Sequence, residues 1–440
     1  MKAHETLLAL IILAFFPAAL SAQDEWSLEK CIKYAQENNL NIKQQKLSLR
    51  ESRNNVLQSK MDFLPSLSAS GSHNFSWGRS VNLNDLTIIK NKLTQSSSVN
   101  LSSSVDIFNG FSKINKLKSN KTQLEISEQE IEKTKNSITI AITKSYLQVL
   151  LAEEIEKNNK ENLISITRQV ERTKKFVDAG KQAYSSFLEI QAQLATEKVQ
   201  LVTADNDVRT NYLTLKQLLD IPDSMVFHIE NPVIKESSEI RTEDGIRNIY
   251  NSALSLPRIK SAELSLKKSE TDLKAVKGTA YPSISVSAGY GTYYSDSQQG
   301  SLLHQFDNNR NPSIGLSLNI PVFRNLSIHT NIKNSELAVE NYKIELRKEK
   351  QDLYKEIQSA YNDAVSYYNK LAAAQENLKS SERSFRDVEN KYNVGAVDVT
   401  DYIIARTKLF NAQSDYSQTK FQYFFQLKIL DFYRGIPIKL

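Results

Sequence analysis

Cysteine, proline and glycine are scarce in this chain of 440 residues, which has 1, 9 and 12 of them. The single cysteine, Cys31, excludes an internal disulfide, and no cluster of Cys and His suggests a zinc site. The stretches 66–221 and 322–436 contain no proline, and 111–179 and 316–394 contain no glycine. Because both residue types interrupt helices, these gaps predict two very long helices.

The charge balance and the motifs give no sign of nucleic-acid binding or catalysis. The 56 basic and 50 acidic residues leave a mild net charge of +6, and the two signs are interspersed along the predicted helices. The sequence lacks a P-loop, a Gly-rich dinucleotide motif and a nucleophile elbow. Carboxylate pairs such as Glu153 and Glu154 fall on charged helix faces. We therefore expect no enzyme, no cofactor and no metal.

The N-terminus resembles an export signal. Lys2 precedes an apolar run over 7–20, and small residues follow, so cleavage after Ser21 or Ala22 is expected and residues 1–22 are assigned to a signal peptide. An N-terminal membrane anchor is the alternative, but the run is short for a span and no second apolar segment follows. In the mature chain, any membrane segment would have to consist of strands.

The mature sequence contains an internal repeat. The segment Leu64-Pro65-Ser66 returns as Tyr281-Pro282-Ser283, and Gly180 returns as Gly395, which is 215 positions later. A fixed-period repeat of this kind indicates a structure built from similar half-units. We assign repeat 1 to 23–222, a connector to 223–241 and repeat 2 to 242–440.

Each repeat is predicted to contain a helix, two strands, a very long helix, a tip and a returning helix. The first helices are expected at 27–61 and 242–278, the long helices at 111–178 and 326–393, and the returning helices at 184–220 and 399–434, with tips near Gly180 and Gly395. Apolar residues in the second long helix recur at spacings of three, four and seven, as in a coiled coil; they include Leu346, Leu353, Ile357, Tyr361 and Val365.

Four strands are expected at about 64–77, 94–108, 282–294 and 312–323. Each alternates between an apolar face and a small, polar, nearly uncharged face, as in a membrane barrel with lipid outside and water inside. An antiparallel sheet on a soluble core also alternates, but the strand length and the aromatic residues near the strand ends favour the barrel. The predicted lumen residues are Ser68, Ser70, Asn100, Ser102, Ser285, Ser287, Ser317 and Asn319.

Four strands cannot close a water-filled barrel, so the barrel should be shared between copies of the chain. The expected fold class is therefore mixed, with a long α-helical coiled-coil barrel and four transmembrane β-barrel strands per chain, in two internal structural repeats.

These features together resemble the TolC outer-membrane efflux family. The resemblance rests on the signal peptide, the two repeats, the Pro-Ser start of each serine-rich strand and the tip Tyr392-Asn393-Val394-Gly395, with 176–180 as its weaker first copy. It implies a homotrimer in the cell outer membrane, embedded in lipid, with a helical tunnel in the periplasm. The tunnel would dock on a periplasmic adaptor and an inner-membrane pump, as the exit duct of a tripartite efflux or type I secretion system.

The resemblance also implies site residues. The periplasmic gate would contain Tyr392 and Asp401, held to Ser185 and Ser186, and the tips Gly180 and Gly395 would dock the adaptor. Val397 and Ile404 occupy the positions of the family's gate arginine and second aspartate, so hydrogen bonding and packing should close this gate more than salt bridges. A helix-start carboxylate favoured by the helix dipole is the alternative role of Asp401.

A periplasmic coiled-coil scaffold or adaptor-like protein is the second functional hypothesis. An adaptor would need a compact domain rich in Gly and Val, and the connector is too short to form one. It is expected to belong to a small belt around the helices. The serine-rich lining implies little selectivity, and the exported substrate is not encoded in any motif.

Overall fold

The computed structural model describes residues 25–81, 86–222, 224–232 and 245–440. The predicted signal peptide and most of the connector lie outside these ranges. The chain forms two compact units. The sheet unit comprises 43–134 and 254–353, and the tip unit comprises the described residues up to Ile42 with 135–253 and 354–440. Each unit therefore combines segments of both repeats.

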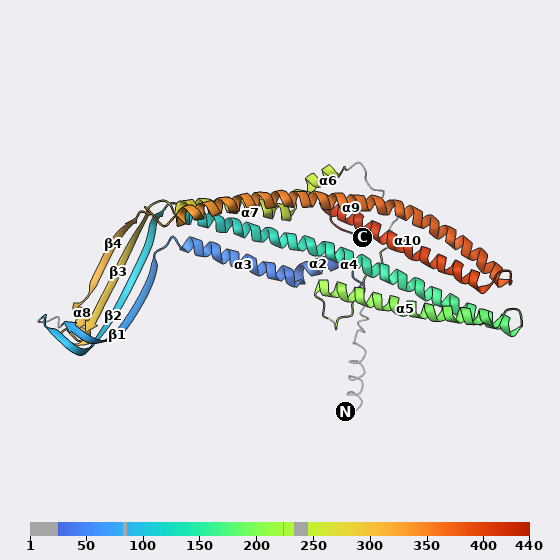
Figure 1. The fold of residues 1–440 in the computed structure, drawn as a ribbon, viewed down its shortest axis with the longest axis horizontal. Coiled ribbons are helices and arrows are strands. Elements are labelled where there is room, and N and C mark those ends of the chain that lie inside the picture. The colour runs from blue at the N-terminus through green and yellow to red at the C-terminus, as the bar shows by residue number, and fades with distance from the viewer. Residues whose placement is uncertain (1–24, 82–85, 223, 233–244) are drawn as a thin grey trace, which may run out of the picture. The chain divides into compact units, whose positions relative to one another are not determined.

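The sheet unit contains one four-stranded antiparallel sheet in the order β1-β2-β3-β4 (Figure 1). Its strands are β1 (Ser66–Val81), β2 (Ile88–Asn109), β3 (Ser283–Ser295) and β4 (Asn311–Asn319). The first two are longer than predicted, because much of the segment between the predicted strands 64–77 and 94–108 continues the hairpin.

The second strand pair differs from prediction at both ends of β4. This strand stops at Asn319, where its pairing with Ser283 ends, and not at 323. Pro321 has no N–H to extend the ladder. The loop before β4 contains a short helix that the sequence analysis missed, α8 (Leu302–Asn308), whose first turn is capped by Ser301.

The strand register places all eight predicted lumen residues on one face. Residues that pair directly across an antiparallel ladder project to the same side. Ser68 pairs with Ser102, and Ser70 with Asn100. The pairings of β2 with β3 and of β3 with β4 carry this face across the sheet through Ser287, Ser285, Ser317 and Asn319. The Ser68 and Ser102 hydroxyls lie 2.8 Å apart.

The opposite face of the sheet is apolar, and large side chains on it are exposed in the described part of the chain. Leu67, Trp77 and Ile314 are 72%, 75% and 83% exposed. A soluble sheet of this size normally packs one face on a core. Here the polar face is also mostly exposed. The fold therefore presents two open faces of opposite character.

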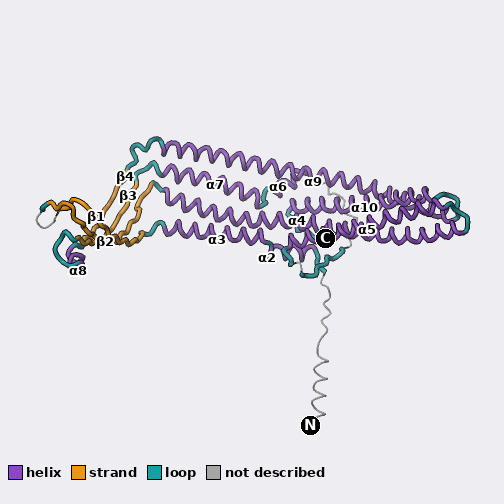
Figure 2. Tube along the Cα trace, turned by 60° about the horizontal axis from the view of Figure 1, so that its bottom comes forward, coloured by secondary structure: helices purple, strands orange, loops and turns teal. Residues whose placement is uncertain are grey.

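Four helices of the sheet unit lie side by side in the order α3, α4, α7, α9 (Figure 2). They are α3 (Leu40–Met61), α7 (Pro257–Gly278) and the first parts of α4 (Ser112–Asp178) and α9 (Ser327–Asn393). The Ser52 and Ser127 hydroxyls, which lie 2.8 Å apart, join α3 to α4.

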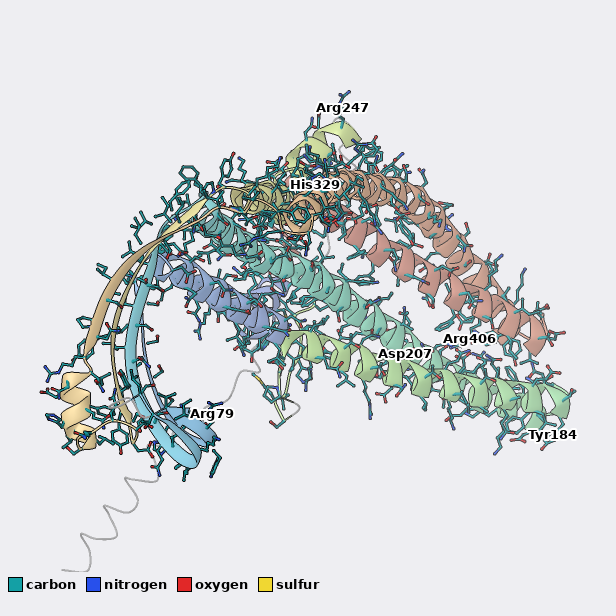
Figure 3. The ribbon with its side chains drawn as sticks, turned by 60° about the vertical axis from the view of Figure 1, so that its left-hand side comes forward. Arg79, Tyr184, Asp207, Arg247, His329 and Arg406 are labelled. Carbon is teal, nitrogen blue, oxygen red and sulfur yellow. The ribbon has the colours of Figure 1, made fainter. Side chains whose placement is uncertain are left out.

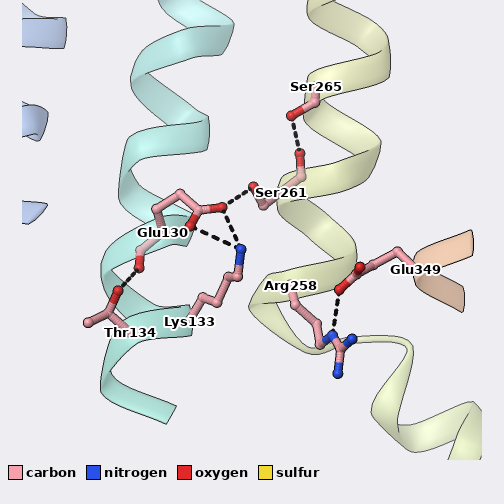
Figure 4. Close-up of polar contacts among 7 residues, drawn as sticks. All are labelled: Glu130, Lys133, Thr134, Arg258, Ser261, Ser265 and Glu349. Atoms are coloured by element: carbon pink, nitrogen blue, oxygen red, sulfur yellow. Dashed lines mark hydrogen bonds and ion pairs between the residues drawn. The ribbon is translucent and has the colours of Figure 1, made fainter. Parts of the chain in front are cut away.

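Polar contacts also join α7 to its two neighbours (Figure 4). The Ser261 hydroxyl donates to Glu130 on α4 at 2.6 Å, and Arg258 Nε donates to Glu349 on α9 at 2.6 Å. Lys133 lies 3.2 Å from the second Glu130 oxygen. Hydroxyl contacts and ion pairs thus accompany buried apolar residues, such as Val56, Ile126 and Ile131, along these helices.

The tip unit contains α2 (Leu28–Asn38), α5 (Tyr184–Leu219), α6 (Ile246–Ala253) and α10 (Val399–Arg434), with the remaining parts of α4 and α9. Its larger apolar core gathers Trp26, Cys31, Ile142, Tyr146, Leu215 and Phe227. Among the described residues, no helix combines the length and the apolar character needed to cross a membrane.

The first described residues of the chain pair with the connector in this core. Trp26 and Ile229 form a parallel bridge. The buried Tyr146 hydroxyl donates to the carbonyls of Trp26 and Glu230, at 3.1 and 2.6 Å. Burial raises the pKa of the Tyr146 hydroxyl, so it remains a donor. The described part of the connector therefore packs on the helices.

The long helices begin and end within one residue of the predicted positions, whereas both shorter helices are interrupted. Asn39 separates α2 from α3: its side chain accepts from Asn41 N at 2.9 Å and donates to the Leu218 carbonyl at 2.8 Å. Pro257 starts α7, after an extended Leu256. Single helices over 27–61 and 242–278 were therefore wrong.

The two strand-to-helix corners share an unusual backbone conformation. Gly110 and Phe111 have φ of 62° and 63°, and Asn325 and Leu326, 215 positions later, have φ of 46° and 62°. Two successive left-handed residues are costly outside glycine. Their recurrence shows that both repeats turn from strand to long helix in the same way.

Gly110 is the corner residue least able to accept a side chain. A methyl group there would collide with the backbone of Gly278. We expect Gly110→Ala to destabilise the protein by more than about 1–2 kcal/mol, from the left-handed backbone alone. Gly245→Ala is the matched control, because its Cβ would meet nothing within 4 Å. Thermal unfolding of the purified protein measures both; equal midpoints would contradict this account of the corner.

Candidate functional site

The tip unit brings together the ends of two helical hairpins, α4–α5 and α9–α10. Each hairpin turns at a left-handed glycine, Gly180 with φ 68° and Gly395 with φ 76°. The same hydrogen-bond pattern closes both helices: Lys181 N donates to Phe176 O at 2.8 Å, and Ala396 N to Lys391 O at 2.9 Å. These bonds satisfy carbonyls that the helix end leaves free. The tight tips thus follow from glycine's backbone freedom.

An apolar cluster joins the two hairpins just behind their tips. Its buried members are Ile166, Ile190, Tyr392, Val399 and Tyr402. The rings of Tyr392 and Tyr402 lie 5.1 Å apart, and Phe385 lies 5.6 Å from Tyr402. Val397, at the family's arginine position, packs against the same cluster. Packing therefore occupies the position at which the resemblance implies a charged latch.

Tyr392 is hydrogen-bonded to α4 and not to the predicted serines. Its buried hydroxyl lies 2.8 Å from Thr173 Oγ1 and 3.4 Å from Gln182 Oε1. Thr173 itself donates to the Gln169 carbonyl at 2.9 Å, so Tyr392 is the donor to Thr173. Helical side chains tilt toward the N-terminus of their own helix. This tilt directs Tyr392 away from the tip and onto α4.

Ser185 and Ser186 lie instead in the first turn of α5, where Ser185 is exposed and Ser186 half-buried. In the described part of the chain, neither serine is hydrogen-bonded to Tyr392. The role of these serines in the gate stays a prediction, and within the described chain Tyr392 pairs with Thr173 instead.

Asp401 is exposed in the first turn of α10. The cap of this helix is Asp398, whose carboxylate accepts from Asp401 N at 2.9 Å. The Asp401 carboxylate is therefore not needed as the cap, although it still lies at the favourable end of the helix dipole. Ile404, at the position of the family's second gate aspartate, is exposed as well.

A buried arginine, Arg406, holds α10 against α4 (Figure 3). It is 5% exposed. Its Nε donates to Asn162 Oδ1 at 2.7 Å, and its Nη1 donates to Ser165 Oγ at 2.9 Å and to Tyr402 OH at 2.8 Å. Its Nη2 donates to the Asn162 carbonyl. Burial raises the pKa of the Tyr402 hydroxyl, and the nearby Arg406 partly opposes this shift.

Asn162 links Arg406 to a second buried charge, Glu197 on α5. Glu197 is 5% exposed and accepts from Asn162 Nδ2 at 2.5 Å and from Gln193 Nε2 at 2.7 Å. This network was not predicted from the sequence. The available signal was a charged residue on an apolar helix face: Arg406 follows Val399 by seven residues and Tyr402 by four.

The polar face of the sheet is the second candidate site. Its small residues leave room for neighbouring side chains. The Asn100 side chain lies against Gly291, and a Cβ added at Gly291 would be 2.6 Å from the Asn100 amide oxygen. Asp106, at the end of this face near the helices, forms an ion pair with Lys113 at 2.7 Å. Among the described residues, no group of three or more His, Cys, Asp or Glu side chains is placed to hold a metal ion.

Known proteins share this architecture. CmeC, an outer membrane channel of Campylobacter jejuni, superposes with a TM-score of 0.78 at 17% identity, covering 94% of this chain and 86% of that one. VceC, an outer membrane protein of Vibrio cholerae, gives 0.76 at 16%, covering 93% and 96%. CusC gives 0.79 at 17%, covering 94% and 93%. At these identities the likeness shows the fold, and it confirms the predicted fold class.

Sequence comparison identifies the family. The outer membrane efflux protein BepC of Brucella suis biovar 1 (strain 1330) is 22% identical over 330 residues, which are 74% of this chain and 66% of that protein. The family model described as outer membrane efflux protein matches residues 31–220 and 248–430. The two matched segments correspond to the two repeats, and the resemblance inferred from the sequence is confirmed. The chain belongs to the outer membrane efflux protein family.

Proposed function

We propose that three copies of this chain form an outer-membrane exit duct, which passes substrates from a periplasmic adaptor and an inner-membrane pump to the outside. Three four-stranded sheets would close one twelve-stranded barrel, and the long helices would form the tunnel below it. The duct would be passive, and the pump would supply both energy and choice of cargo. Family membership supports this role.

The observation that carries the proposal is the sheet with two open faces. Along β3 the apolar face extends from Ile284 to Tyr294, about ten residues or ~33 Å of strand. At a barrel tilt of about 40°, this length gives a band ~25 Å tall, the height of the apolar band of outer-membrane barrels. A scaffold in the periplasm would expose this face to water.

The polar face fits a wide, weakly selective lumen. Its members from Ser68 to Ser76 on β1, from Thr94 to Ser104 on β2 and from Ser285 to Gly291 on β3 are serine, threonine, glycine and asparagine. Hydroxyl and amide groups keep such a surface wet without favouring one charge. The Asp106–Lys113 ion pair adds no net charge at the end of this face.

The tips would form the gate and the adaptor-docking surface. Tyr392 and Asp401 would contribute to closure of the tunnel, and Gly180 and Gly395 would shape the surface that the adaptor meets. Ser185 and Ser186 lie in the first turn of α5, where they are available to a neighbouring chain. The packed Tyr392–Tyr402 pair supports closure by packing and hydrogen bonds.

Adjacent strand positions test the barrel directly. Ser102→Cys should react rapidly with a charged, water-soluble thiol reagent in outer-membrane fractions, whereas Leu101→Cys, which faces the other way, should be protected by lipid. The native Cys31 gives no background, because it is buried and its pKa is raised to about 12. Equal labelling at positions 101 and 102 would contradict the barrel and favour the scaffold.

Asp401 tests the gate. Asp401→Ala should raise the closed-state conductance in planar bilayers and the leak of large antibiotics in cells, because it removes a carboxylate from each chain at the constriction. Asp398→Asn is the control, since asparagine retains the cap of α10. Conductance and drug sensitivity that match the unmodified protein would remove Asp401 from the gate.

The buried hydroxyl pair behind the tip predicts unequal effects of two substitutions. Thr173→Val should destabilise the protein by about 1–3 kcal/mol, because it leaves the Tyr392 hydroxyl without its main acceptor. Tyr392→Phe should cost less, since Thr173 keeps its bond to Gln169. The double variant should resemble Tyr392→Phe. Chemical denaturation would show this order, and a more damaging Tyr392→Phe would contradict the assigned direction of the bond.

A further inference from the structure

The network of Arg406, Asn162 and Glu197 is the most deeply buried charged group among the contacts between the two hairpins. Removing charges from water is unfavourable unless hydrogen bonds replace the lost hydration. Arg406 meets this requirement with four hydrogen bonds, to Asn162, Ser165 and Tyr402. Glu197 meets it with bonds from Asn162 and Gln193. The network is therefore satisfied in one arrangement of the helices.

Three helices contribute to this arrangement, and they come from both repeats. Arg406 belongs to α10, Asn162 and Ser165 to α4, and Glu197 to α5. The Asn162 side chain uses its oxygen toward Arg406 and its amide nitrogen toward Glu197, so it fixes both partners at once. A rotation or slide of α10 against α4 would break several of these bonds together and leave charges buried without partners.

The buried Tyr392–Thr173 hydroxyl pair is a second directional contact between the hairpins, with one short hydrogen bond. Two further polar contacts lie at the surface. Arg172 donates to the Asn393 carbonyl at 3.1 Å, and Thr400 to Glu189 at 3.3 Å, and both contacts are exposed. Exposed polar contacts contribute little, because water competes for them. The apolar cluster permits sliding better than directional bonds do. Arg406 therefore makes more of the buried directional bonds between the hairpins than the Tyr392–Thr173 pair does.

We infer that Arg406 is a positioning residue for the gate: with Asn162 and Glu197 it sets the resting aperture of the tips by holding α10 in one register against α4 and α5. This inference rests on the proposed duct function. Position 397, where the resemblance implies an arginine, is a valine in this chain. Arg406, nine residues later and buried on α10, would supply an arginine contact in its place. The contact lies inside the helical wall and not in the passage.

Single-channel recording in planar bilayers tests the inference. Arg406→Met should raise the ratio of open to closed time by about tenfold or more, because buried partners lose their hydrogen bonds. The conductance of the open state should remain unchanged, since Arg406 does not line the passage. Arg406→Lys should restore part of the closed time through its retained charge. Lys408→Met, at an exposed position on the same helix, is the control and should behave like the unmodified protein.

A second variant keeps the test possible if the first variant does not assemble. Should Arg406→Met give no oligomer, Asn162→Ser removes both bridging side-chain bonds without removing a charge, and it should produce the same shift in open time. If Arg406→Met assembles and gates like the unmodified protein, the inference is overturned and the duct function stands. If Arg406→Met does not assemble, the same gating in Asn162→Ser overturns the inference. An unmodified protein that forms no channels at all would overturn both the inference and the proposed function.

Discussion

The fold depends on one constraint: a four-stranded sheet with open faces and open edges must be completed by something outside the chain. Within the described chain, β1 and β4 each pair on one side only. Unpaired edges are unfavourable in lipid, where no water satisfies their N–H and C=O groups. Joining β4 of one copy to β1 of the next removes every edge, and the alternation along each strand then places serine inside and leucine outside. The oligomer is therefore a condition for the sheet to exist in a membrane.

The helices obey a different rule, because they stay in contact with water. Their packing mixes apolar clusters with hydroxyl contacts and ion pairs, such as Ser261 with Glu130 and Arg258 with Glu349. Polar contacts of this kind specify register more than they add stability. In the proposed gate, the tyrosine cluster near the tips would provide the stability and the Arg406 network would provide the register. This gate would rest on packing and hydrogen bonds, with Val397 at the position where the resemblance implies an arginine.

Much of this structure could be predicted from local sequence patterns. Strand alternation placed Ser68, Ser102 and Ser285 on one face, and the absence of glycine and proline fixed the ends of α4 and α9 within one residue. The interruption at Asn39 was not predictable in this way, because it depends on a bond to the Leu218 carbonyl, distant in sequence. Similarly, Tyr392 pairs with Thr173 because of how two hairpins pack, and transfer of family residues by position led to Ser185 and Ser186 instead. Arg406 was not predicted, and its only signal in the sequence was a charge on an apolar stripe. Its network could not be read from the sequence, because the members outside its own helix come from two other helices.

The mass of the intact assembly tests the central claim most directly. The protein would be extracted with a mild detergent from outer-membrane fractions and measured by native mass spectrometry. Our account predicts a mass of three chains in that fraction, because only a closed ring of sheets satisfies the strand edges. A monomer or dimer recovered from the periplasm without detergent would contradict it, and would show that the apolar face of the sheet is covered by something other than lipid.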